Sequence, residues 1–248
     1  MEGRDMATEL MTNVIKWLEN YRDSTGCRGV VLGVSGGKDS TTVAMLAKKV
    51  WGDDVVGVMM PNKTQKDITD ARRICGCLNI RNYEINIGHS YDAVMNDIIW
   101  GTNFVPDKKA ATNIPPRLRM IVLYAIAQTL GYRVIGTGNA SEAYIGWTTK
   151  WGDGAYDLNP IGNLTCSEVI SLGLELAQEF GLDESLIVKP PADGLTGKND
   201  EENFGFTYDT LDSYILRGAD IPTADKMAIE AMHRASAHKR ELPPKFTF

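Results

Sequence analysis

Several features that would place this chain in a special class of protein are missing from its 248 residues. Its 26 lysines and arginines are outnumbered by 32 aspartates and glutamates, and the net charge of −6 argues against general nucleic-acid binding. No apolar run approaches the roughly 20 residues that a membrane-spanning helix needs. Residues 1–22 carry charges throughout, unlike a secretory signal peptide. We therefore expect a cytoplasmic protein.

Cysteine is also scarce, with only Cys27, Cys75, Cys77 and Cys166. The Cys75-Gly-Cys77 spacing is too tight for a usual zinc pair, and a second pair is missing. Reduced thiols are thus favoured over a disulfide framework. The composition, with 43% hydrophobic and 23% charged residues, is ordinary for a globular protein, and the chain is long enough to bury a large core. We expect a single domain over residues 1–248.

Strand and helix patterns alternate along the chain. The hydrophobic spacing predicts strands at 29–34, 54–60, 80–87 and 132–137, and helices at 6–22, 40–50, 66–78, 89–100, 116–130, 166–180 and 224–236. This order is typical of an α/β fold with a doubly wound, mostly parallel sheet and helices on both faces. Residues 190–206 are rich in Pro, Gly, Asp and Asn and are predicted to form a mobile loop.

The most informative motif lies where the first predicted strand ends. The apolar run 30–34 leads into Ser35-Gly36-Gly37-Lys38-Asp39-Ser40, where a helix begins. A strand, a glycine turn and a helix start direct backbone N–H groups and the positive end of the helix dipole at one place, which suits phosphate. The Walker spacing fails because Leu32 stands where it needs glycine and Asp39 follows the lysine. The three-glycine dinucleotide pattern is also missing from this turn.

A second strand end carries further polar residues, in the run Thr137-Gly138-Asn139-Ala140-Ser141-Glu142. If both strand ends face one crevice, Asp39 and Glu142 would lie close together. Two carboxylates beside a triphosphate form a natural Mg²⁺ site. Taken alone, Glu142 could instead complement a helix dipole, and Asp153, between two glycines, could be a turn residue.

The second predicted strand ends in two methionines, Met59 and Met60, followed by Gln65. The methionines could flank an adenine ring and Gln65 could contact a nucleotide. Methionine in a core is far more common than methionine at a nucleotide. We favour the nucleotide because the glycine turn at 35–40 lies on the neighbouring predicted strand.

The Ser-Gly-Gly-Xaa-Asp-Ser run resembles the pyrophosphate-binding loop of N-type ATP pyrophosphatases. Further motifs are similar to NAD synthetases, and they follow that family's order from about residue 8 to 245. They are Asn113 with Arg117-Leu-Arg-Met120, Thr137-Gly-Asn-Ala-Ser-Glu142, Thr149-Lys-Trp-Gly-Asp-Gly154, Asp157, Pro160-Ile161, Pro191-Ala-Asp193, Asp200-Glu201 with Gly205, Tyr208 with Asp212, and His238-Lys-Arg240 before Pro243. The resemblance points to the ammonia-dependent members and an adenine nucleotide alpha hydrolase-like fold.

The resemblance implies an ATP-dependent amidation of deamido-NAD. The nicotinate carboxylate would attack the α-phosphate of ATP, giving an acyl-adenylate and pyrophosphate. Ammonia would then attack the activated carbonyl and expel AMP, leaving NAD. The enzyme would use Mg²⁺, and the family forms homodimers with substrate sites near the interface. The predicted helix segment 121–127 is apolar nearly all round, so we expect it to be buried in the core or against a partner.

The same resemblance assigns roles to individual residues. Catalysis is expected from Asp39, Glu142, Lys150 and Asp153, with Asp39 and Glu142 as the Mg²⁺ ligands. ATP binding is expected from Gly33, Ser35, Gly36, Gly37, Asp39, Ser40, Met60, Gln65 and Thr137. Binding of deamido-NAD is expected from Asn113, Arg117, Arg119, Lys150, Asp153, Asp157, His238 and Lys239.

Two departures from the family pattern leave alternatives open. Many members carry lysine where this chain has Cys166, and many have Thr or Ser at the position of Pro191. A thiol cannot supply the missing charge, and Lys189, Lys198 or Lys38 could compensate. The chain could also be another ATP-pyrophosphatase-type amidating ligase, or a nucleotide-sensing relative without turnover.

The nitrogen donor is expected to be free ammonia, or ammonia delivered by a separate glutaminase. A glutaminase usually needs its own domain, and residues 1–28 hold about one helix. Cys27 precedes a strand and has no histidine near it in sequence, so a core or surface thiol is favoured over a catalytic nucleophile. We therefore expect no glutaminase domain.

Overall fold

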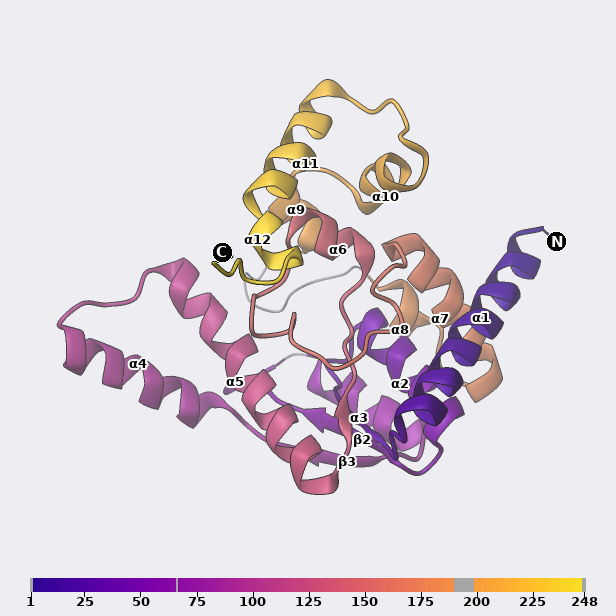
Figure 1. Cartoon of the computed structure of the whole chain (residues 1–248), viewed down its shortest axis with the longest axis horizontal. Helices are drawn as coiled ribbons and strands as arrows, with labels where there is room; N and C mark the ends of the chain where they lie inside the picture. The colour runs from indigo at the N-terminus through magenta and orange to yellow at the C-terminus, as the bar shows by residue number, and fades with distance from the viewer. Residues whose placement is uncertain (1, 66, 190–198, 247–248) are drawn as a thin grey trace.

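The structure, a computed structural model, describes residues 2–65, 67–189 and 199–246 (Figure 1). Its helices and strands are, in chain order, α1 Glu2–Thr25, β1 Val30–Gly33, α2 Lys38–Trp51, β2 Val55–Met59, α3 Ile68–Cys77, β3 Arg81–Glu84, α4 Gly88–Thr102, α5 Lys108–Leu130, β4 Arg133–Val134, α6 Ala140–Ile145, α7 Cys166–Phe180, α8 Ser185–Val188, α9 Asp200–Phe204, α10 Tyr208–Arg217, α11 Thr223–Ala235 and α12 Ala237–Arg240.

The strands form a parallel sheet in the order β3-β2-β1-β4. Val30 of β1 pairs with Val55 of β2 on one side and with Arg133 of β4 on the other. A parallel bridge between Ile135 and Leu158 continues the sheet beyond β4. The predicted fold class and the positions of all four predicted strands are therefore confirmed. β1 and β4 are neighbours, so the turns that follow them lie side by side at the carboxyl edge.

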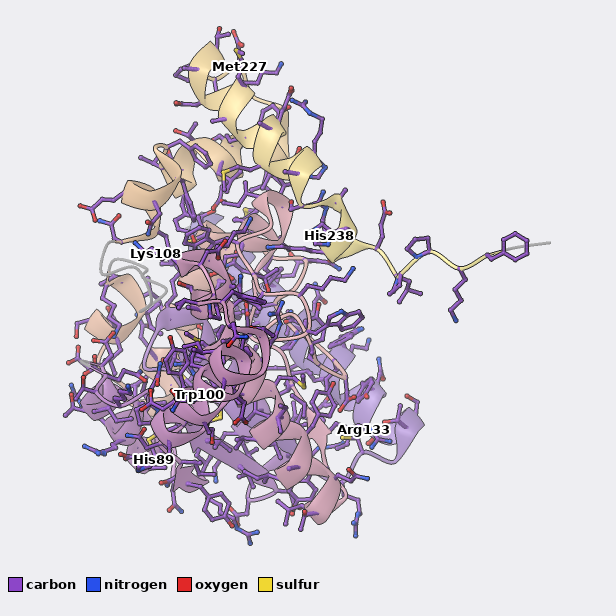
Figure 2. The ribbon with its side chains drawn as sticks, turned by 90° about the vertical axis from the view of Figure 1, so that its left-hand side faces the viewer. His89, Trp100, Lys108, Arg133, Met227 and His238 are labelled. Carbon is purple, nitrogen blue, oxygen red and sulfur yellow. The ribbon has the colours of Figure 1, made fainter. Side chains whose placement is uncertain are left out.

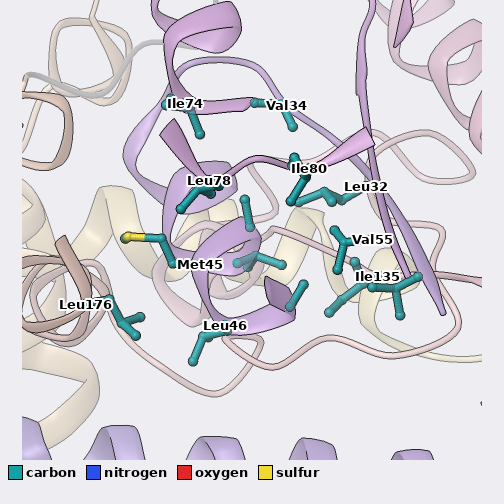
Figure 3. Close-up of a cluster of buried hydrophobic side chains, with 14 of the residues drawn as sticks. Leu32, Val34, Met45, Leu46, Val55, Ile74, Leu78, Ile80, Ile135 and Leu176 are labelled. Atoms are coloured by element: carbon teal, nitrogen blue, oxygen red, sulfur yellow. The ribbon is translucent and has the colours of Figure 1, made fainter. Parts of the chain in front are cut away.

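Alternate residues of the two central strands supply two separate cores, as the two-residue period of a strand requires. Val30, Leu32 and Val34 face α1, α2, α3 and α7 in the larger cluster, which Figure 3 shows in part. Val31 faces the other side of the sheet, where residues of α5 cover it. The sheet thus has helices on both faces, as the alternating pattern predicts.

A third cluster packs the C-terminal helices together, above the sheet in Figure 1. Its centre is aromatic, with Phe204 stacked on Phe206 at 5.6 Å and edge-on to Tyr208. The predicted loop at 190–206 is wrong in its last part, because Asn199 caps the short helix α9 and accepts a hydrogen bond from the Glu202 N–H. Residues 190–198 lie outside the described part of the chain. Helices α6 and α10 were also not predicted.

Helix α5 begins eight residues earlier than predicted, since the Asp107 side chain accepts a hydrogen bond from the Ala110 N–H and caps the helix at Lys108. Within this single chain, residues 121–127 are only partly buried in the core, and burial of the remainder against a partner stays a prediction. Val122 and Leu123 pack on the sheet, but Ile121 is 57% exposed. Together with α4, the start of α5 projects from the body (Figure 1). None of the described helices combines the length and apolarity needed to cross a bilayer.

Candidate functional site

The loop between β1 and α2 is stabilised by hydrogen bonds of its own serines. The hydroxyls of Ser35 and Ser40 are hydrogen-bonded at 3.0 Å, and the Gly37 N–H donates to the Ser35 Oγ at 3.1 Å. Gly37 is the N-cap residue and provides no side-chain cap. The first turn of α2 therefore keeps backbone N–H groups directed outward, in the arrangement that binds anions.

Gly36 is the residue of this loop that has to be glycine. Its φ is +86°, a backbone conformation that side chains strongly disfavour. A Cβ at this position would lie 2.8 Å from the Asp67 carbonyl oxygen and 3.1 Å from the Ala71 nitrogen. The loop is thus pressed against the start of α3. Gln65 donates to the Ser35 carbonyl at 3.0 Å, so this residue braces the loop.

Asn139 joins the two strand ends into one site. Its side-chain amide donates to Asp39 Oδ1 at 3.0 Å, and its backbone N–H donates to Glu142 Oε2 at 3.1 Å. Its own Oδ1 accepts from the Glu142 N–H at 2.9 Å, which completes a capping box at the start of α6. The two carboxylates predicted to meet are therefore linked through one buried asparagine.

The electrostatics of this pair suit a divalent cation. Burial, and then the negative charge of Asp39, raise the pKa of the Glu142 carboxyl from 4.5 to about 8. A bound cation would relieve the repulsion between the two carboxylates. Among the described residues, no group of three or more His, Cys, Asp and Glu side chains forms a metal site. Mg²⁺ would thus rely on this pair together with substrate phosphates, the mode common in nucleotide enzymes.

The remaining predicted ATP residues border the same edge of the sheet. Gly33, at the end of β1, faces Met60, since a Cβ on Gly33 would lie 3.4 Å from the Met60 Cε. Met60 is buried and belongs to the core beside α5, so it also fits the alternative of an ordinary core methionine. Thr137 is partly exposed in the turn after β4, two residues before Asn139.

Three predicted substrate residues on α5 reach neighbouring segments. Asn113 accepts a hydrogen bond from the Thr149 hydroxyl at 2.7 Å, and Arg117 lies 3.4 Å from the Lys150 carbonyl oxygen. Arg119 donates to the Met60 carbonyl at 3.1 Å, and burial lowers the pKa of its guanidinium. Helix α5 thereby connects the nucleotide edge with the turn at 148–154.

The predicted residues of that turn are brought together with the C-terminus. Lys150 donates to the His238 carbonyl, and Lys239 donates to the Gly146 and Thr148 carbonyls at 2.8 and 2.6 Å. The imidazole of His238 is exposed. Asp153 accepts from the Thr148 hydroxyl and the Thr149 N–H, at 2.7 and 2.9 Å, which is the turn role open to it from the sequence.

Asp157 is the predicted site residue that the structure does not bring to this crevice. Its carboxylate accepts from the Val134 N–H at 2.8 Å, inside β4. Its charge reaches Cys27, which precedes β1, and raises the pKa of that thiol in addition to the larger effect of burial. Asp157 therefore lies toward the amino ends of the strands and joins β4 to the following chain.

Comparisons with known proteins give the family of this chain. The family model for NAD synthase matches residues 10–243. An NH(3)-dependent NAD(+) synthetase of Carboxydothermus hydrogenoformans is 40% identical over 95% of this chain and 96% of its own length. This chain belongs to the NAD synthase family.

Two solved structures resemble the chain over almost its whole length. The NMN synthetase of Francisella tularensis has a TM-score of 0.88 at 33% identity, covering 98% of this chain and 99% of that protein. The NH3-dependent NAD synthetase of Campylobacter jejuni has a TM-score of 0.76 at 28% identity, covering 97% and 99%. The predicted resemblance to NAD synthetases is thereby confirmed.

Lys38 is one of the lysines that could supply the charge missing at position 166, and the structure places it beside Asp39. It is 2% exposed, and its ammonium donates to Asp39 Oδ2 at 2.7 Å. Burial works to lower the pKa of Lys38, but the charge of Asp39, with smaller contributions from Cys166 and Glu142, raises it overall. Lys189 instead pairs with Asp70 at 3.0 Å, and Lys198 lies outside the described residues, as does Pro191.

Cys166 is the first residue of α7 and is buried. Burial raises the pKa of its thiol to about 12, although the nearby Lys38 acts to lower it. Its backbone N–H donates to the Ser141 hydroxyl at 2.9 Å, and the Ser167 N–H donates to Asp212 Oδ2 at 2.8 Å.

Sequence reasoning gave no role to Asn139 or Ser141. An Asn three residues before Glu at a helix start was the available signal.

Proposed function

We propose that this chain is an ammonia-dependent carbon–nitrogen ligase that uses ATP to amidate deamido-NAD to NAD. Family membership gives the reaction class. The observation that carries the proposal for this chain is the Asn139 bridge, which holds Asp39 and Glu142 together next to the open start of α2. An anion site beside a carboxylate pair is what a metal-bound triphosphate requires.

ATP would be bound along the carboxyl edge of the sheet. Its phosphates would occupy the 35–40 loop, where Ser35 and Ser40 offer hydroxyls and the α2 start offers N–H groups. The adenine would lie near Gly33 and Met60, with Thr137 on the side of β4. Gln65 would keep the loop in position through its bond to the Ser35 carbonyl.

Mg²⁺ fits the donors that face this loop. Asp39 and Glu142 would hold it, and the ion would neutralise charge on the departing pyrophosphate. This assignment is supported by the raised pKa of Glu142, which burial and then the nearby charge of Asp39 raise although Lys38 acts to lower it.

The chain's own task in the reaction is placement and charge stabilisation. The nicotinate carboxylate attacks the α-phosphorus, the bond to the β-phosphate oxygen breaks, and pyrophosphate leaves. Ammonia then attacks the acyl-adenylate carbonyl, loses a proton, and AMP departs. Backbone N–H groups at the start of α2 stabilise the phosphate charge that develops in the first step.

Deamido-NAD would be bound between α5 and the 148–154 turn. Asn113, Arg117 and Arg119 come from α5, and arginine forks suit its phosphate oxygens. Lys150 and Asp153 come from the turn, which Lys239 and the His238 backbone fasten to the C-terminus. Asp157 is left out because it lies beside β4 toward the amino ends of the strands.

We also propose that two copies associate through the projecting helices. Trp100 is 83% exposed near the end of α4, and Ile121 is exposed on α5. Figure 2, viewed from the side of this projection, has Trp100 facing the viewer. Contiguous exposed apolar patches mark contact surfaces, and we take these two residues as part of one. Sedimentation velocity of the pure protein tests this, and a monomer at micromolar concentration would contradict it.

The first experiment is product analysis. The protein is incubated with deamido-NAD, ATP, Mg²⁺ and ammonium, and chromatography quantifies NAD and AMP. We expect both in equal amounts. If neither forms although ATP binds, the amidation proposal fails and a nucleotide-sensing role replaces it.

A second candidate is amidation of the mononucleotide, deamido-NMN, to NMN. It is favoured by the similarity in structure to the Francisella NMN synthetase. The two candidates share the ATP site and the carboxylate pair, and differ in whether the adenylate half of deamido-NAD is needed. The same assay with each substrate decides between them through kcat/KM. A preference for deamido-NMN would replace the first candidate.

We expect that glutamine will not replace ammonium. A glutaminase nucleophile is usually an activated thiol with a lowered pKa. Burial raises the pKa of the Cys27, Cys75 and Cys166 thiols, to about 11 for Cys75 and about 12 for Cys166. The measurement is NAD formation with glutamine in place of ammonium. Glutamine is used at about 10 mM, which is above the KM of most enzymes for their substrates. Glutamine-driven turnover by the pure chain would contradict this expectation.

A further inference from the structure

Lys38 occupies a position that ordinary helix chemistry disfavours. It is the first residue of α2, where the positive end of the helix dipole repels a cation. It is also 2% exposed, although lysines are almost never fully buried unless they are paired. Positions that break local rules in this way are expected at functional sites. The neighbours of the ammonium therefore indicate what it does.

The ammonium is paired with the residue that follows it. Lys38 Nζ donates to Asp39 Oδ2 at 2.7 Å. Adjacent residues on a helix point in different directions, so this contact needs the lysine side chain to turn toward the carboxylate. On the opposite oxygen, Asp39 Oδ1 accepts from the Asn139 amide at 3.0 Å. The carboxylate is thus held by one donor on each oxygen.

The lysine side chain is held from the C-terminal helices. Its ammonium lies 5.5 Å from the centre of the Tyr208 ring, within range of a cation–π interaction. Tyr208 is buried, and its hydroxyl donates to Asp200 Oδ2 at 3.0 Å. The start of α10 therefore fixes the place of the ammonium. Lys189, the other described lysine near the loop, pairs with Asp70 instead.

We propose that Lys38 is a positioning residue for Asp39, orienting its carboxylate for a divalent cation and the triphosphate. An ionised carboxylate has about four acceptor positions. One donor on each oxygen leaves the others for the cation while the plane of the group stays fixed. The inference rests on the proposed function to the extent that it takes Asp39 as a Mg²⁺ ligand.

The test measures nucleotide binding without turnover. Calorimetry follows the binding of adenosine 5′-(α,β-methylene)triphosphate, which cannot be cleaved between its α and β phosphates, over a range of Mg²⁺ concentrations. For Lys38→Met we expect the half-saturating Mg²⁺ concentration to rise about tenfold, as is usual when a partner of a metal ligand is lost. In steady-state assays, kcat at saturating Mg²⁺ should recover toward the wild-type value.

Two further variants make the result specific. Lys48→Met removes a lysine of the same helix that pairs with Asp53 at 3.0 Å on the surface, and it should leave the Mg²⁺ dependence unchanged. Lys38→Arg keeps a positive charge, but its planar fork cannot reproduce a single-point contact on Oδ2. It should shift the Mg²⁺ dependence in the same direction and by less, and it serves if Lys38→Met does not fold.

The outcomes separate this inference from the proposed function. A higher half-saturating Mg²⁺ concentration in the Lys38 variants supports the positioning role, even if the wild-type protein forms no NAD. Wild-type Mg²⁺ dependence in folded Lys38→Met overturns it, even if NAD forms normally. Where only Lys38→Arg folds, its unchanged Mg²⁺ dependence overturns the inference in the same way.

Discussion

Helices α2 and α6 begin in the same topological position, directly after neighbouring parallel strands, yet their first turns differ. α2 starts at Gly37 without a side-chain cap, so its N–H groups stay available. α6 has Asn139 as its N-cap and a complete capping box, so the N–H groups of Asn139 and Glu142 are already satisfied. The uncapped start is suited to an anion. The capped start instead fixes a carboxylate, Glu142, in place for a cation.

With these two helix starts, one edge of the sheet offers donors for the anionic phosphates and carboxylates for a cation. Asn139 connects the two starts, since its amide donates to Asp39 on α2 while its backbone donates to Glu142 on α6. Substitutions at each helix start test these separate roles.

The largest effect is expected from Gly36→Ala, which displaces the loop before the uncapped start of α2. The new Cβ would meet backbone atoms of Asp67 and Ala71 at 2.8 and 3.1 Å, so the loop must move. A displacement of about 1 Å costs about a hundredfold in rate. The measurement is kcat/KM for ATP in the product assay. Gly26→Ala is the matched control, because Gly26 also has positive φ but nothing lies within 4 Å.

Gly26→Ala should cost about 1 kcal/mol of unfolding free energy with activity kept. Full activity in Gly36→Ala would show that the loop does not have to keep this shape.

The next effect is expected from Glu142→Gln, which removes a charge but keeps the capping box, since glutamine can also accept from the N-cap N–H. Losing a cation ligand should lower kcat/KM about a hundredfold, or about 3 kcal/mol. Thermal stability should stay equal or rise, because the repulsion with Asp39 is relieved. Glu168→Gln at the same capping-box position of α7 should change neither quantity. Loss of stability in Glu142→Gln would assign Glu142 to the cap alone.

A smaller effect is expected from Asn139→Ala, which removes the bridge itself. Loss of the N-cap should lower the unfolding free energy by about 1 kcal/mol. Loss of the bond to Asp39 should also raise the half-saturating Mg²⁺ concentration about tenfold. Asn199→Ala removes the same cap from α9 and should show the stability loss alone. Equal Mg²⁺ dependence in the two variants would contradict the bridge.

A further effect is expected in the pH dependence of stability, measured without nucleotide and with EDTA. The pKa of Glu142 is raised from 4.5 to about 8, so between these values the folded chain binds a proton that the unfolded chain has released. Raising the pH through this window therefore favours unfolding. Thermal unfolding of wild-type protein should lose stability from pH 5 to 8 relative to Glu142→Gln. Parallel curves for the two proteins would show that Glu142 does not cause this pH dependence.

The uncapped start of α2 could be predicted from the sequence because its signal is local. The run 30–40 contains strand, glycines and helix start in one continuous segment, and the structure has all three. The capped start was reached only in part. Glu142 was predicted as a cation ligand, but its partner Asn139 was not singled out, because its bond to Asp39 spans 100 residues.

The C-terminal region was the least predictable from sequence. Helices α9 and α10 are short, and Phe204 and Tyr208 are buried by contact with each other and with Trp147. Such burial depends on distant residues rather than on periodicity. The same limit explains Asp157, whose place beside Val134 follows from the pairing beyond β4. Its role in substrate binding remains a prediction without structural support, as does the location of the protein in the cytoplasm.

The alternation of strands and helices and the glycine turn could be predicted from the sequence, because these depend on residues close together in the chain. The sequence also placed a carboxylate after each of two predicted strands, and the sheet order makes those strands neighbours. Only the tertiary structure decided that Lys38 is buried against Asp39 and Tyr208, and that Asn139 joins the two strand ends. The physical reason is that a side chain's charge partner is selected by packing, which brings together residues that no sequence pattern places side by side.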